Sequence, residues 1–258
     1  MAEFALTEKN KRFYFGWIPD VLFRPRLAFQ RISASTRAVW ITPLLILSCL
    51  ILLNALVAGR LKSQAALSGE ISYPADYQYY TPEQQAQYTQ AIQSTQGPVF
   101  VYVLPAIGSL LRVWIGWLIL GGILHLITTL FGGRGSTAIS MNIVAWGSLP
   151  LAIRALVQIL FMLITQKLIS TPGLSGFSPT GDSGWILFVG QIFRLIDIYV
   201  IWQIILLIIG VRSSTALSTT KSSSGVILTI LIILAIQAGL SYLGSLLGNL
   251  NITRPFFF

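Results

Sequence analysis

Long apolar runs constrain the fold of this chain more than any other feature of its sequence. The first, from about Val39 to Ala58, matches the roughly 20 residues that a helix needs to cross a bilayer. Of 258 residues, 54% are hydrophobic and 10% are charged, against roughly 25% charged residues in an average soluble domain. The sequence therefore predicts an all-α, polytopic membrane protein, a bundle of about five transmembrane helices preceded by an interfacial helix.

The runs divide the chain into three parts. We expect a cytoplasmic segment over 1–38, a membrane domain over 39–247 and a short outer tail over 248–258. The expected spans are about 39–58, 104–131, 138–164, 185–211 and 225–247. The first is long enough to remain as an uncleaved anchor. Between the first two spans, Thr81-Pro82-Glu83-Gln84 is typical of a capping box and predicts a short exposed helix from Pro82.

The basic residues are distributed unevenly about these spans. With the N-terminus in the cytoplasm, the outer side holds Arg60, Lys62, Lys167 and Arg254. The cytoplasmic side then holds Lys9, Lys11, Arg12, Arg24, Arg26, Arg31, Arg37, Arg134, Arg212 and Lys221. The positive-inside rule favours this orientation, so we expect a multi-pass plasma-membrane protein with its C-terminus outside. The net charge of +9 thus reflects orientation, and no nucleic-acid partner is expected.

Apolar and basic residues interleave just before the first span. Phe29 and its apolar neighbours alternate with Arg24, Arg26 and Arg31, and Pro25 suits the first position of a helix. This pattern predicts an amphipathic helix on the cytoplasmic leaflet, held by acidic lipid headgroups. A dedicated protein-docking surface is the alternative.

Four charged residues interrupt the predicted spans. Arg112, Arg154 and Arg194 lie about 24 to 29 Å from the inner boundary at roughly 1.5 Å per residue, near the outer edge of the hydrocarbon. Arg194 and Asp197 are three residues apart and would share one face of a continuous helix, where they could neutralise each other. Arg112 and Arg154 have no obvious acidic partner. They either snorkel to headgroups or form an anion site for a lipid phosphate or an anionic substrate.

No group of residues has the pattern of a catalytic or metal site. His125 is the only histidine and Cys49 the only cysteine, so neither a shared metal nor a disulfide is expected. No nucleophile has a matching histidine and carboxylate, and no glycine-rich phosphate loop follows a strand. We therefore expect neither an enzyme nor a bound cofactor.

Four short motifs resemble those of the Yip-domain family in their order along the chain. They are residues 22–29 (LFRPRLAF), 130–136 (LFGGRGS, with Gly132, Gly133 and Gly135), 142–150 (NIVAWGSLP, ending at Pro150), and 197–203 (DIYVIWQ, with Trp202) leading to 209–212 (IGVR, with Gly210). This resemblance implies five spans and a cytoplasmic N-terminus. The family is named for binding Ypt/Rab GTPases, and this chain is similar to its prokaryotic members. Some of those are associated with ABC-type exporters.

Two functions follow from these observations. The first is a non-enzymatic accessory or assembly subunit of a larger membrane complex, with the resemblance indicating an ABC-type exporter. Its partners would be the lipid bilayer and another integral membrane protein. The alternative is a small-molecule or lipid transporter with an anion site at the outer arginine layer.

Overall fold

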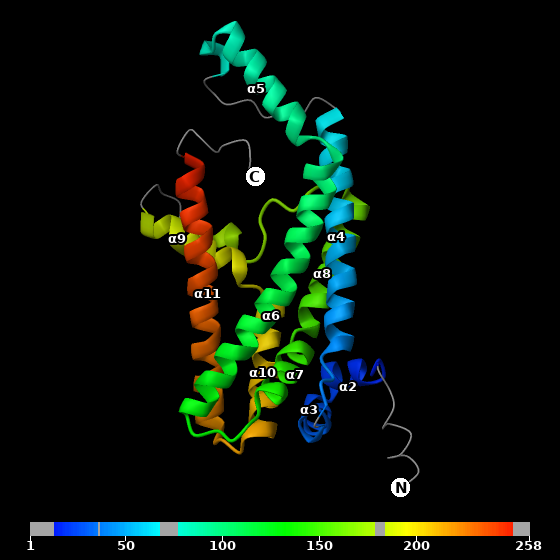
Figure 1. The fold of residues 1–258 in the computed structure, drawn as a ribbon, viewed down its shortest axis with the longest axis vertical. Helices are drawn as coiled ribbons and strands as arrows, with labels where there is room; N and C mark the ends of the chain where they lie inside the picture. The colour runs from blue at the N-terminus through cyan, green and yellow to red at the C-terminus, as the bar shows by residue number, and fades with distance from the viewer. Residues whose placement is uncertain (1–12, 36, 68–76, 179–183, 250–258) are drawn as a thin grey trace.

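The computed structural model describes residues 13–35, 37–67, 77–178 and 184–249, and all regular structure in these ranges is helical (Figure 1). Five segments within the described ranges are long and apolar enough to cross a membrane, which confirms the predicted all-α membrane fold. They are α4 (Ile41–Leu67), η3 (Val99–Val103) with α6 (Leu104–Leu130), α7 (Thr137–Gly147) with α8 (Leu149–Thr165), α10 (Ile198–Thr215) and α11 (Thr219–Asn249). Shorter elements are α2 (Trp17–Phe23), α3 (Pro25–Ala34), η2 (Tyr77–Tyr79), α5 (Pro82–Thr95), η4 (Ser175–Phe177) and α9 (Gly184–Leu195).

The short helices lie at the two ends of the bundle and across it. Figure 1 shows α2 and α3 at the end where α4 begins, whereas α5 projects beyond the opposite end. The predicted capping box of α5 is confirmed, since the Thr81 amide donates to Gln84 Oε1 (2.9 Å) and the Gln84 amide to Thr81 Oγ1 (3.3 Å). Lys9, Lys11, Arg12, Arg254 and most of the predicted outer tail lie outside the described residues.

Helix α3 is amphipathic, but protein covers its apolar face. Ala28, Phe29 and Ile32 are at most 2% exposed and pack with residues of α7 and α10. Gly210 of α10 makes this approach possible, because a Cβ at that position would lie 3.1 Å from the Phe29 ring. Hydrophobic periodicity alone does not tell whether lipid or protein covers an apolar stripe, and the location of α3 on the cytoplasmic leaflet stays a prediction.

Two buried polar side chains of α7 fix the link between α3 and α4. Asn142, which is fully buried, accepts from the Val39 amide (3.0 Å) and donates to the Arg37 carbonyl (2.9 Å). The Trp146 indole donates to the Val39 carbonyl (3.1 Å). These bonds replace the helical partners that the backbone loses between α3 and α4.

The predicted fourth span, 185–211, is not one helix. α9 ends at Leu195 and α10 begins at Ile198. The spanning segment is therefore α10 alone, which extends to Thr215. Figure 1 shows α9 lying across the bundle rather than continuing the axis of α10. The apolar run concealed this break because Ile196 and Asp197 are flanked by apolar residues on both sides.

Replacing Asn142 by leucine should destabilise the fold. The Val39 amide and the Arg37 carbonyl would lose their side-chain partner, and each unsatisfied buried group costs about 1–3 kcal/mol. Unfolding in detergent, followed by circular dichroism, measures the loss. Gln87→Leu removes an exposed amide of α5 and should leave stability unchanged; equal stability of the two variants would contradict the role given to Asn142.

Candidate functional site

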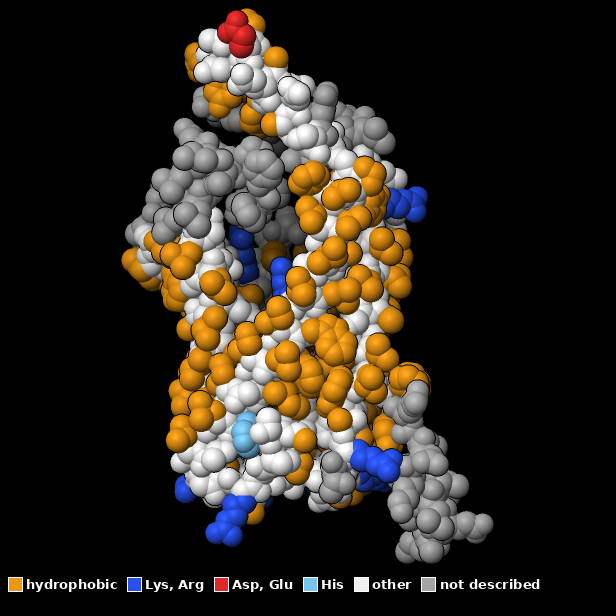
Figure 2. All heavy atoms as spheres, viewed as in Figure 1, with side chains coloured by type: hydrophobic (Ala, Val, Ile, Leu, Met, Phe, Trp, Pro, Cys, Tyr) orange, Lys and Arg blue, Asp and Glu red, His pale blue; other side chains and the backbone are white. Residues whose placement is uncertain are grey.

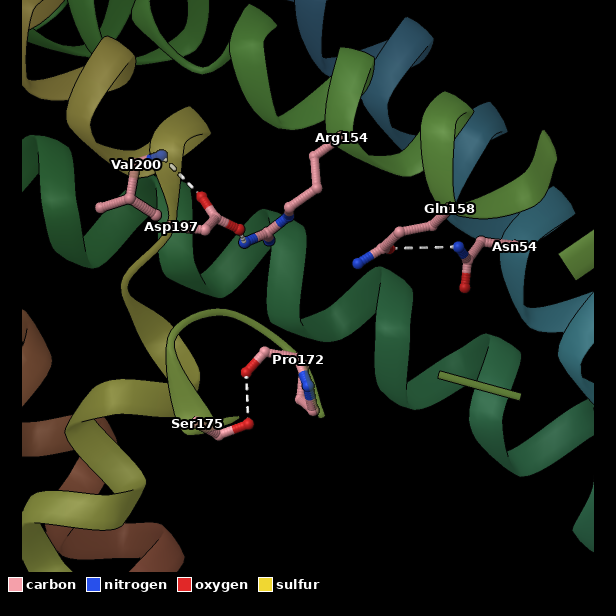
Figure 3. Close-up of polar contacts among 7 residues, drawn as sticks. All are labelled: Asn54, Arg154, Gln158, Pro172, Ser175, Asp197 and Val200. Carbon is pink, nitrogen blue, oxygen red and sulfur yellow. Dashed lines mark hydrogen bonds and ion pairs between the residues drawn. The ribbon is translucent and has the colours of Figure 1, made fainter. Parts of the chain in front are cut away.

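An ion pair occupies the break between α9 and α10. Arg154 of α8 donates from Nη1 to Asp197 Oδ2 at 3.0 Å, with the two side chains 33% and 17% exposed. The other carboxylate oxygen, Oδ1, accepts from the Val200 amide (2.9 Å), so Asp197 is also the N-cap of α10 (Figure 3). An aspartate at this position favours a helix start through its hydrogen bond and its charge.

The loop before α9 in the sequence supplies a hydrogen-bond donor for the backbone carbonyls at the C-terminal end of α9. The Leu174 amide donates to the carbonyls of Phe193 (2.9 Å) and Ile196 (3.0 Å). Gly173 has φ +63°, and a Cβ there would lie 2.7 Å from the carbonyl oxygens of Arg194 and Ile196. Only glycine fits this approach, which allows the loop to cover the exposed carbonyls.

A second polar contact lies one turn along α8. Gln158 Oε1 accepts from Asn54 Nδ2 of α4 at 3.3 Å. Figure 3 shows Arg154 and Gln158 leaving α8 towards Asp197 and Asn54 respectively. One polar stripe of α8 therefore joins α4 on one side to the start of α10 on the other.

Two predictions about the outer arginine layer were wrong. Asp197 pairs with Arg154 rather than Arg194, because the break removes the helical register that would have placed residues 194 and 197 on one face. Arg154 consequently has an acidic partner. Arg112 and Arg194 are exposed, and neither makes an ion pair or side-chain hydrogen bond with another described residue.

This arrangement binds α8 to the start of α10. Both oxygens of Asp197 accept hydrogen bonds, Oδ2 from Arg154 and Oδ1 from the Val200 amide. Its negative charge also occupies the start of α10, where a bound anion would otherwise be favoured. Among the described residues, no cluster of three or more His, Cys, Asp or Glu side chains could hold a metal ion.

The spans and motifs agree with a comparison against known families. A family model described as the Yip1 domain matches residues 20–241. The chain belongs to the Yip1 family. Comparison with curated proteins and with solved structures gives no significant match.

The glycine motif of this Yip1 domain ends α6. Gly132 has φ +91°, the Gly132 amide donates to the Thr129 carbonyl, and the Gly133 amide donates to the Thr128 carbonyl, both at 2.9 Å. This pair of bonds is a Schellman motif, which uses glycine in a left-handed conformation to stop a helix. Gly133 and Gly135 then pass close to Thr215 at the end of α10.

Residues of the third and fourth sequence motifs lie at the contact between α7, α8 and α10. Pro150 starts α8, and Trp202 packs half-buried against the core. Gln203, 5% exposed, donates to Ser148 Oγ at 3.0 Å. Sequence reasoning gave no role to Asn142, Gln158 or Gln203, although a polar residue within an apolar span is itself a signal of a specific contact.

Replacing Arg154 by leucine should lower the free energy of unfolding by about 1–3 kcal/mol, since the partly buried Asp197 charge would lose its partner. Arg194→Leu, the matched control, should change it by less than about 0.5 kcal/mol. The double variant Arg154→Leu/Asp197→Asn should lose less than the sum of its single changes. An equal loss in the two arginine variants would contradict the assigned pairing.

Proposed function

We propose that this Yip1-family protein is a non-enzymatic accessory or assembly subunit of a larger membrane complex. The observation that carries the proposal is the outward face of α6. Gly108 and Gly116 lie on this face, and a Cβ at either position would meet nothing within 4 Å. Glycine weakens a helix interior by roughly 0.5–1 kcal/mol relative to alanine, so these positions are not explained by the protein's own packing.

Another glycine of α6, by contrast, is explained by packing within the protein. Gly121 faces α7, where a Cβ would collide with the Met141 side chain. Around Gly108 and Gly116, by contrast, Leu111 and Ile115 are about half exposed, at 53% and 49%. Small residues among apolar ones let a second membrane helix approach closely.

Arg112 lies between these two glycines and is exposed. A charge facing lipid in a membrane span costs a few kcal/mol unless it is paired or reaches the headgroups. A carboxylate on a neighbouring membrane helix would neutralise Arg112 while that helix packed on Gly108 and Gly116. An ABC-type exporter in the plasma membrane, with the N-terminus of this chain in the cytoplasm, is the partner and setting that we propose.

A second candidate function is transport of a small molecule or lipid past the outer arginines. Figure 2 shows Lys and Arg side chains inside a recess between α11 and α6. Since Arg154 forms an ion pair with Asp197, such an anion site would depend on Arg112 and Arg194.

Photo-crosslinking in native membranes tests the first proposal. A crosslinker at Leu111, 53% exposed, should capture one membrane protein at fixed stoichiometry, whereas one at Leu160 of α8, 49% exposed, should not. The variant Gly108→Leu/Gly116→Leu should lower recovery of that protein at least about tenfold, or ~1.4 kcal/mol, with unchanged stability.

Recovery of lipid alone at Leu111 would contradict the accessory role and favour transport. Equal capture from Leu111 and Leu160 would indicate unspecific proximity and would also count against the proposal.

A further inference from the structure

A polar groove lies between α3, α10 and α11, at the end of the bundle opposite α5. Its volume is about 310 Å³, near the lower end of the range of small-ligand sites. It is lined by Arg26 and Gln30 of α3, Ile208, Ile209, Arg212 and Ser213 of α10, and Thr219 of α11. The lining therefore contains two guanidinium groups and no acidic residue.

The described acidic residues do not neutralise these two arginines. Asp20 pairs with Arg31 (2.8 Å), Asp197 pairs with Arg154, and Glu83 lies in α5. Within the described ranges, neither Arg26 nor Arg212 forms an ion pair. Both side chains are exposed, so they present charged donors to whatever enters the groove.

The groove has a polar end and an apolar end. Arg212 and Ser213 lie in the last turn of α10, and Thr219 begins α11. Ile208 and Ile209 lie one turn deeper in the same apolar helix and are half-buried. A ligand that fits both ends carries an anion at the membrane surface and an apolar chain directed into the membrane.

The walls of the groove are held at a fixed separation. Phe29 of α3 packs beside Gly210, and the hydroxyls of Ser33 and Ser213 lie 3.3 Å apart. Arg26, Gln30 and Ser33 follow a helical spacing of four and three residues, so they share the side of α3 that faces α10. The two arginines are thus positioned by packing before any ligand binds.

We propose that this groove binds a phosphate anion, and that the phosphate belongs to the headgroup of an anionic phospholipid. The guanidinium groups would bind the phosphate oxygens with charge-assisted hydrogen bonds, while the isoleucines contact the start of an acyl chain. The site is separate from the Arg154–Asp197 pair and from the α6 face, so it stands or falls independently of the proposed accessory role.

The test is lipid binding to the full chain in detergent, measured by native mass spectrometry with phosphatidylglycerol and, separately, phosphatidylcholine. Arg26→Gln and Arg212→Gln should each weaken phosphatidylglycerol binding about tenfold. Arg24→Gln is the matched control, because it removes an exposed charge next to α3 that does not line the groove. Thermal unfolding of each variant checks that the fold is intact.

Three outcomes would overturn the proposal. An equal loss in Arg24→Gln would show general surface electrostatics. Equal affinity for phosphatidylcholine would remove the requirement for an anionic lipid. Inorganic phosphate that binds the same two arginines as tightly as phosphatidylglycerol would identify a soluble anion as the ligand.

Discussion

A backbone group that leaves a helix within a bilayer has no water to bond, so the protein must supply its partner. In this chain, protein groups supply such partners at the link between α3 and α4 and at the break between α9 and α10. Asn142 and Trp146 bond the backbone that enters α4. The Leu174 amide bonds the carbonyls at the end of α9, and Asp197 bonds the first turn of α10. The geometry of the bundle at these interruptions follows from the positions of these few polar groups.

The polar groups that stabilise the interrupted helices differ from the charged groups that we propose bind a partner or a lipid. The sequence placed Arg154 in a possible anion site at the outer arginine layer, yet Arg154 and Asp197 bond each other and the start of α10. Charged side chains that form no ion pair among the described residues include Arg112 on α6 and Arg26 and Arg212 beside the groove. The proposed binding surfaces are built on these charges.

Local signals in the sequence predicted local structure well. The apolar runs indicated the spans, and the 81–84 capping box indicated the start of α5. The break at 196–197 escaped notice because the run from 185 to 211 contains no proline and is apolar on both sides. The Arg154–Asp197 pair could not be predicted either, since it joins residues 43 positions apart. Hydropathy likewise could not show that α10 covers the apolar face of α3.

Hydrogen exchange of the intact protein in lipid nanodiscs tests the central claim that protein groups satisfy the interrupted backbone. The amides of Val39, Leu174 and Val200 are the ones that the account places in bonds at the interruptions. We predict that they exchange as slowly as amides in the middle of α10. Exchange as fast as that of the exposed helix α5 would contradict the account, because it would show these interruptions open to water.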